Sequence, residues 1–176
     1  PGTEKRHESF NVISKQGEAQ LVFLGDSITH GWDGKGKAVW EKTWAPLKAA
    51  NFGIGGDRTE HVLWRLENGN FDGLKPKAIV LMIGTNNTGH QGRPQKELNG
   101  AVYQCTAEQT AEGIKAIVAK LNQEIVRILQ LREVRDQLSA MGMTVVAGTP
   151  EQFAQTIQDD TVKFSRIIKS AGIRIE

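Results

Sequence analysis

The sequence has 176 residues, of which 39% are hydrophobic and 24% are charged, and its formal net charge is +2. This length suits one domain with a sizeable core, and the composition is that of an ordinary soluble protein. A nearly balanced charge without a long Lys/Arg run gives no sign of nucleic-acid binding. The single cysteine, Cys105, excludes an intrachain disulfide and a cysteine-rich zinc site.

The hydrophobic pattern predicts no membrane span, since no apolar run approaches the roughly 18 residues that a span needs. Nothing at the start of the sequence is typical of a signal peptide. The compartment is therefore left open.

The first half of the chain predicts strands that alternate with helices. Strands are predicted at three apolar runs that each end at glycine, residues 21–24, 51–54 and 78–83. Helices are predicted from spaced apolar positions at residues 4–17, 38–49 and 59–66. This alternation is typical of a parallel sheet with helices on both faces.

The second half begins with a polar loop at residues 88–100. A helix follows over 106–122, where Thr106 and Gln109 form a capping box. Apolar positions in 124–129 fit either a strand or a continuation of this helix. The remaining expected elements are a helix at 131–141, a strand at 144–147 and a last helix from about 148 to 171.

We therefore expect a single α/β domain over residues 1–176. It should be a three-layer sandwich around a flavodoxin-like parallel sheet of four or five strands.

Three of these strands end in turns made of small and polar residues. The turns are Gly-Asp-Ser-Ile-Thr at 25–29, Gly-Ile-Gly-Gly-Asp at 53–57 and Gly-Thr-Asn-Asn at 84–87. Ligands of open parallel sheets bind at the carboxyl ends of the strands, so the turns should form one crevice. Acyl transfer needs a nucleophilic hydroxyl and donors aimed at the developing oxyanion. Ser27 offers the hydroxyl, while the Gly56 backbone N–H and the Asn86 amide offer donors.

These turns also resemble those of a known family. The segments at 25–29 and 84–87 look like the first and third blocks of the GDSL/SGNH hydrolases. The run from 51 to 87, with His-Val-Leu-Trp-Arg-Leu at 61–66, is similar to the catalytic subunits of platelet-activating factor acetylhydrolase. The likeness covers residues 5–122 and implies an SGNH-like segment over about 1–122. It implies that Ser27 is the nucleophile and that Gly56 and Asn86 complete the oxyanion hole.

The family's general base is a histidine in an Asp-x-x-His motif near the C-terminus. No histidine follows residue 90 in this sequence. When Gly-Thr-Pro-Glu at 148–151 is aligned with the family's final helix, Thr144 and Ala147 occupy the positions of the aspartate and the histidine. This departure puts the catalytic base in doubt.

Four histidines precede that point, and their predicted roles differ. His30 follows Ser27 by about one helical turn, and His90 lies in the loop after Asn86, so either could replace the base. His61 is expected to pack or to cap its helix, and His7 is expected to lie far from the site. A base from a second subunit is a further alternative.

The C-terminal part resembles a different family. Residues 131–176 look like the end of the solute receptors of tripartite tricarboxylate transport, the Bug family. This resemblance implies no ligand residues here, because those receptors bind largely through other segments. We expect the segment to complete the sheet with strands and helices. The sequence leaves open whether the junction near 122–131 is natural or engineered.

Other features have structural interpretations. Asp26 and Asp57 are expected to bind loop backbone rather than to transfer protons, and Asp159-Asp160 should be a surface pair. Three tryptophans could pack in the core or line a substrate pocket: Trp32, Trp40 and Trp44. No nucleotide-binding loop occurs, so we expect no cofactor and no metal.

The sequence thus predicts a serine esterase that hydrolyses short-chain acetyl esters through Ser27. Its partner would be a small-molecule ester, and a homodimer is left open. The alternative is an impaired SGNH scaffold that lacks the Asp-x-x-His base and serves as a ligand-binding or structural domain.

Overall fold

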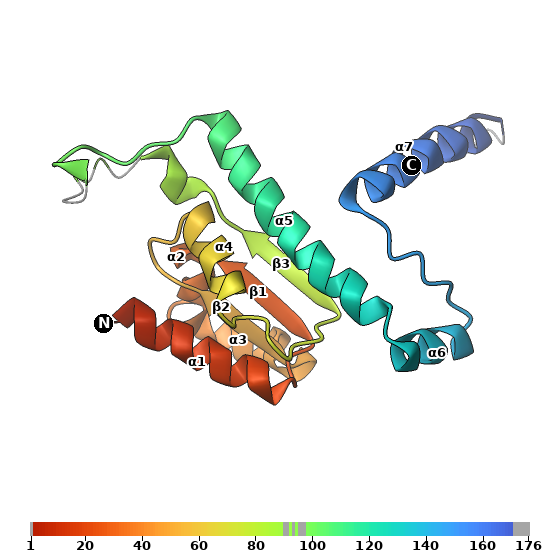
Figure 1. The fold of residues 1–176 in the computed structure, drawn as a ribbon, viewed down its shortest axis with the longest axis horizontal. Helices are drawn as coiled ribbons and strands as arrows, with labels where there is room; N and C mark the ends of the chain where they lie inside the picture. The colour runs from red at the N-terminus through yellow and green to blue at the C-terminus, as the bar shows by residue number, and fades with distance from the viewer. Residues whose placement is uncertain (1, 90–91, 93, 95–97, 171–176) are drawn as a thin grey trace. The chain divides into compact units, whose positions relative to one another are not determined.

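A computed structural model describes residues 2–89, 92, 94 and 98–170. Its contacts divide the chain into two compact units, Pro1–Lys120 and Leu121–Glu176. Figure 1 shows the order of the elements along the chain.

A parallel sheet of three strands forms the centre of the first unit (Figure 1). The strands are β1 (Leu21–Gly25), β2 (Ala49–Gly53) and β3 (Ala78–Met82). They lie in the order β2-β1-β3, with Leu24 opposite Phe52 on one side and Leu81 on the other. This order is the flavodoxin-like one, so the prediction of a parallel α/β sheet is confirmed.

Helices connect and cover these strands. The α-helices of this unit are α1 (Gly2–Gln16), α2 (Ser27–His30), α3 (Lys37–Thr43), α4 (Thr59–Glu67) and the first part of α5 (Ala107–Leu129). Short 3-10 turns lie at η1 (Gly31–Asp33), η2 (Ala45–Leu47) and η3 (Thr85–Thr88). The predicted capping box of α5 is formed, since the Thr106 N–H donates to Gln109 and the Gln109 N–H donates to Thr106 Oγ1, at 2.9 and 3.1 Å.

The core lies mainly between the sheet and α1, α4 and α5. Val22 and Leu24 are alternate residues of β1, and Phe52 lies opposite Leu24 on β2. All three are fully buried, because alternate side chains of a strand point to the same face of the sheet. The Phe10 ring of α1 stacks on Phe52 with the ring centroids 4.6 Å apart. Ile117 of α5 is also fully buried. The register of the sheet is thus fixed by which side chains this core takes in.

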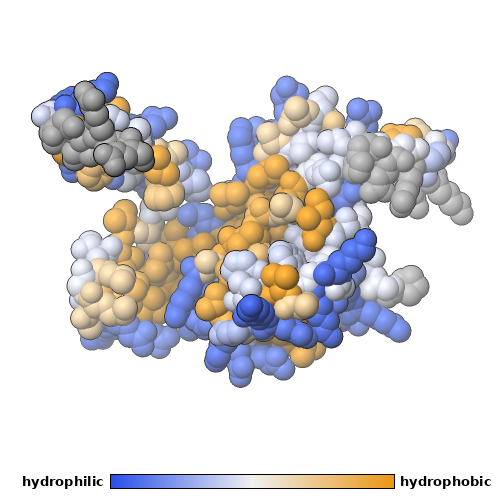
Figure 2. All heavy atoms as spheres, turned by 180° about the vertical axis from the view of Figure 1, so that it is seen from behind, coloured by the Kyte–Doolittle hydropathy of each residue, from blue (hydrophilic) through white to orange (hydrophobic). Residues whose placement is uncertain are grey.

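The other face of the sheet is covered only in part. Phe23 points to that side and meets Trp40 and Trp44 at centroid distances of 5.0 and 5.2 Å. Val80 and Met82 of β3 are 44% and 50% exposed. Figure 2, which views the molecule from behind, shows a broad apolar area on this side.

The regular elements that the structure describes in the second unit are all helices. Residues 124–129, for which strand and helix were both open, belong to α5, and α6 (Arg132–Ala140) and α7 (Pro150–Ser170) follow. The predicted strand at 144–147 is wrong, because these residues form no ladder and Val146 is 85% exposed. The expected count of four or five strands was therefore too high for the described residues, which contain three. Among the described helices, none is long and apolar enough to cross a membrane.

Candidate active site

Ser27 is the first residue of α2 and is exposed where β1 ends. The preceding Asp26 caps the helix, with its Oδ1 atom accepting the Ile28 N–H at 2.9 Å. The expectation that Asp26 binds loop backbone is confirmed by this contact. Capping fixes the direction in which α2 leaves the sheet, and therefore the direction of the Ser27 side chain.

The turn after β2 lies directly against this helix. A Cβ atom added to Gly53 would lie 2.2 Å from the backbone nitrogen of His30. Only glycine therefore allows α2 to approach β2 this closely. A Cβ atom on Gly55 would lie 3.8 Å from the Ser27 Cβ. Gly56 follows with φ of 84°, a left-handed conformation that favours glycine. The residue predicted to donate its N–H thus belongs to the turn that borders the nucleophile.

Asn86 comes from the third turn, η3. Its side-chain Nδ2 donates to the Asp57 carbonyl at 2.8 Å, which fastens the end of β3 to the turn that carries Gly56. The neighbouring Asn87 is buried and accepts the Thr59 N–H on its side-chain oxygen at 3.0 Å. The structure therefore brings together the three turns that hold Ser27, Gly56 and Asn86.

The histidines occupy different surroundings. His30 lies at the end of α2, and its Nδ1 atom and Ser27 Cβ are both 3.8 Å from the Cβ position of Gly55. No hydrogen bond joins His30 to Ser27 in the described part of the chain. His61 Nδ1 accepts the Arg58 N–H at 3.1 Å, which confirms its expected capping role. The prediction for His90 falls outside the described residues.

Sequence reasoning missed a buried polar network behind these turns. Arg65 is 2% exposed and its Nη2 atom lies 2.8 Å from the Asp57 carboxylate, while Nη1 donates to Asn70 Oδ1 at 2.8 Å. Burial raises the pKa of the Asp57 carboxyl, and the positive charge of Arg65 opposes that rise. The available signal was an arginine between Val62 and Leu66 on the apolar face of a predicted helix.

The network continues to His7 on α1. The Asn70 amide nitrogen donates to His7 Nδ1 at 3.0 Å, and its oxygen accepts from Arg65, so the amide orientation is fixed. Only the neutral ring offers a lone pair at Nδ1. Burial of the ring and the charge of Arg65 lower the pKa of His7 below the ordinary 6.5.

This lowered pKa predicts a loss of stability in mild acid. The unfolded chain binds a proton on His7 as the pH falls through about 6.5, whereas the folded protein resists it. The contribution of the neutral His7 ring to the free energy of unfolding is therefore complete above that pH and is lost progressively below it. We expect the urea midpoint of the protein to fall between pH 7.5 and 5.0, and to fall less in His7→Gln. Other titrating groups contribute to both proteins, so parallel curves would show that His7 is not the cause.

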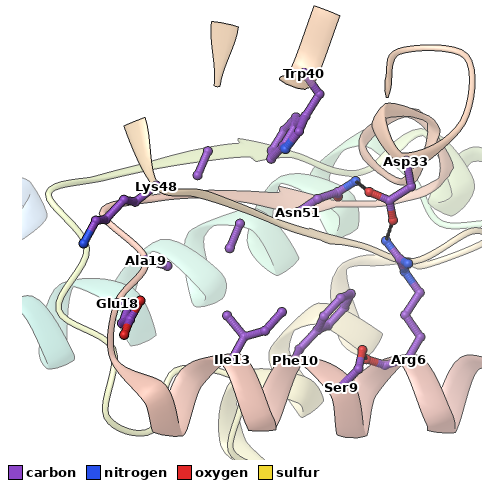
Figure 3. Close-up of a pocket in the computed structure, with 12 residues that line it drawn as sticks. Arg6, Ser9, Phe10, Ile13, Glu18, Ala19, Asp33, Trp40, Lys48 and Asn51 are labelled. Carbon is purple, nitrogen blue, oxygen red and sulfur yellow. Dashed lines mark hydrogen bonds and ion pairs between the residues drawn. The ribbon is translucent and has the colours of Figure 1, made fainter. Parts of the chain in front are cut away.

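A groove of about 470 Å³ runs along the open edge of β2 (Figure 3). Its walls are α1 and the segment that carries Trp40. At one end Arg6 donates to the Gly53 carbonyl at 2.6 Å and pairs with Asp33 at 2.7 Å, and Asp33 accepts from Asn51. These contacts cap the edge of β2 at its carboxyl end, where an exposed strand edge would otherwise be free to pair with another chain. Ser27, Gly56 and Asn86 do not line this groove.

The aromatic residues predicted for either the core or a pocket pack around Phe23. The ring centroids of Trp32 and Trp40 lie 6.0 Å apart, and Trp40 also lines the groove. Asp159 and Asp160 are exposed, as expected of a surface pair. In the described residues, no group of three or more His, Cys, Asp or Glu side chains could hold a metal ion.

Comparison with known proteins agrees with this class of α/β fold. The chain belongs to the GDSL-like Lipase/Acylhydrolase family, which it matches over residues 23–174. It is 43% identical over 120 residues to platelet-activating factor acetylhydrolase IB subunit alpha1 of Bos taurus, covering 66% of this chain and 43% of the relative. It is 40% identical over 117 residues to the alpha2 subunit of Rattus norvegicus, covering 66% and 44%.

A solved structure shares the fold. It is described as a platelet activating factor from Streptococcus pneumonia and matches with a TM-score of 0.50 and 21% identity, over 69% of this chain and 49% of that one. The chain spans less than half the length of the curated relatives quoted above. The resemblance of residues 131–176 to the receptors remains a prediction.

Proposed function

We propose that this chain is a serine ester hydrolase that takes short-chain carboxylic esters, acetyl esters first, and passes the acyl group through Ser27. The observation that carries the proposal is the meeting of three strand-end turns around an exposed Ser27 at the start of α2. Family membership and the acetylhydrolase relatives support the same chemistry.

In this mechanism Ser27 Oγ attacks the ester carbonyl carbon, and its proton passes to a base. The N–H groups of Ser27 and Gly56 and the Asn86 amide stabilise the negative charge that develops on the carbonyl oxygen. The bond to the alcohol then breaks, the alcohol leaves with a proton, and water hydrolyses the acyl-serine. His30 is our first choice of base, because it borders the same turn as Ser27.

The experiment that tests the proposal is the detection of an acyl-enzyme. Purified protein is mixed with p-nitrophenyl acetate, quenched with acid and digested. The mass of the peptide that contains Ser27 is then measured by mass spectrometry. We expect this peptide to gain one acetyl group in the wild type and in the control Ser9→Ala, whose hydroxyl lies on the exposed side of α1. Ser27→Ala should show no acetylated peptide. Equal labelling of all three proteins at other residues would contradict the proposal.

A non-catalytic scaffold is the second candidate. The observation in its favour is chemical: Thr144 and Ala147 stand where the family carries its aspartate and histidine, and no histidine follows residue 90. Such a protein would bind a small ester or carboxylate at the same turns without turning it over.

A further inference from the structure

Arg65 lies at the centre of the contacts beneath the proposed oxyanion hole. Besides the Asp57 carboxylate, its Nη2 atom reaches the backbone carbonyls of Phe52 at 3.2 Å and Gly25 at 3.5 Å. Phe52 is in the last part of β2, and Gly25 ends β1. One guanidinium therefore contacts the ends of two neighbouring strands and the residue that follows Gly56.

The placement of Arg65 follows from helix geometry. Asp57 lies just before the start of α4, and Arg65 belongs to the buried face of this helix together with Val62 and Leu66. Long side chains of a helix point back toward its N-terminus, which brings the guanidinium under the turn at 53–57. The other terminal nitrogen of the guanidinium, Nη1, donates to Asn70 Oδ1 at 2.8 Å.

Backbone hydrogen bonds close the turn itself, from the Ile54 N–H to the Gly25 carbonyl at 3.0 Å and from the Asp57 N–H to the Ile54 carbonyl at 3.2 Å. Gly55 and Gly56 have no side chains to pack, and both are exposed. The Asp57 carbonyl is bound by Asn86 from above, while its carboxylate is bound by Arg65 from the core. Both of these contacts are made by the residue that directly follows Gly56.

We propose that Arg65 is a positioning residue for catalysis, which holds the Gly56 N–H toward the reacting carbonyl by binding Asp57 and the carbonyls of Phe52 and Gly25. The inference rests on the proposed function for its catalytic meaning, since Arg65 is buried and touches no substrate. It assigns the buried arginine of α4 a role that the family motif does not name.

The contacts decide which substitution is informative. Lysine keeps the positive charge but has a single nitrogen, which cannot serve Asn70 on one side and Asp57 with Phe52 on the other. Arg65→Lys should therefore fold and still leave the turn less firmly held. Arg65→Met leaves the Asp57 carboxylate buried without its partner and is expected to unfold more easily, so Arg65→Lys is the primary variant.

The first measurement is structural and needs no turnover. In protein labelled with ¹⁵N-glycine, we expect Arg65→Lys to shift the Gly56 amide signal and to lower its heteronuclear NOE, which reports motion on the picosecond-to-nanosecond scale. The matched control is Ile117→Ala, which truncates a fully buried side chain of α5 and changes no residue of the turn. It should lower stability and leave the Gly56 signal in place.

The second measurement is kinetic. With p-nitrophenyl acetate we expect Arg65→Lys to lower kcat by about 10²-fold with little change in KM, because a small misplacement of a transition-state donor costs about this much. Ile117→Ala, measured well below its unfolding midpoint, should retain the wild-type kcat.

The outcomes separate the two ideas. If the wild type shows no hydrolysis that depends on Ser27, the proposed function fails, and the NMR result still decides whether Arg65 holds the turn. If the wild type is active and Arg65→Lys keeps its Gly56 signal and its kcat, the positioning role is overturned. The same follows if Ile117→Ala changes the Gly56 signal and kcat as much as Arg65→Lys does.

Discussion

Replacing Ser27 with alanine is expected to lower kcat/KM on p-nitrophenyl acetate by about 10²- to 10⁴-fold. This is the range that a positioned base adds to the attack of a serine hydroxyl, and the variant loses the nucleophile on which such a base acts. The change should leave the fold intact, because Ser27 is exposed and Asp26 still caps α2. Initial rates of nitrophenolate release measure the effect, with Ser9→Ala as the control.

The pH dependence of the same reaction identifies the base. A histidine base gives an inflection between roughly pH 5 and 8, because only its neutral form accepts the serine proton. If His30 serves, the rate should rise with pH through that inflection, and His30→Gln should remove it. Equal rates for the wild type and Ser27→Ala would instead support the non-catalytic scaffold, since the Ser27 hydroxyl would then contribute nothing to hydrolysis.

The first unit could be predicted largely because its strands differ from their surroundings in the sequence. Leu21–Gly25 is a short apolar run that ends at glycine, and all its residues except the first are buried. The order β2-β1-β3 brings the ends of three such strands to one edge, and this explains why motif residues distant in sequence meet. The roles of Ser27, Gly56 and Asn86 remain predictions until activity is measured.

The failures have physical causes as well. Residues 144–147 have the β-branched composition of a strand, but a strand also needs a partner, and propensity alone does not supply one. The Arg65 network escaped prediction because its contacts depend on how the loop after α4 folds back onto the helix and onto α1. His7, Asn70 and Arg65 come from α1, the loop after α4, and α4 itself, and no local pattern shows that a buried arginine will find these partners.

Replacing Gly53 with alanine is expected to destabilise the first unit by about 1–3 kcal/mol or more. The new Cβ would lie 2.2 Å from the His30 nitrogen and 2.6 Å from the Thr29 carbonyl carbon, and both are backbone atoms of α2. Neither can rotate away as a side chain could, so α2 must move as a whole. Urea unfolding followed by tryptophan fluorescence measures the loss, because three tryptophans pack beside Phe23.

A matched glycine in the same region separates this clash from a general cost of alanine. Gly31 has helical backbone angles, with φ of −57° and ψ of −18°, and a Cβ atom there would meet nothing within 4 Å. Gly31→Ala should be neutral or should stabilise the fold by up to about 1 kcal/mol, because alanine restricts the unfolded chain. A Gly53→Ala protein as stable as Gly31→Ala would show that α2 does not pack on β2 as closely as described.

The displacement of α2 also predicts a loss of acylation. Ser27 begins the helix that Gly53→Ala pushes away, whereas the Gly53 carbonyl and N–H are held in place by Arg6 and Asn51 at 2.6 and 3.0 Å. The turn therefore stays with β2 while the nucleophile moves, and the distance between Ser27 and the Gly56 N–H changes. Under conditions where both variants are folded, Gly53→Ala should acetylate Ser27 more slowly than Gly31→Ala does. Equal acylation rates would mean that the nucleophile is positioned by β1 alone.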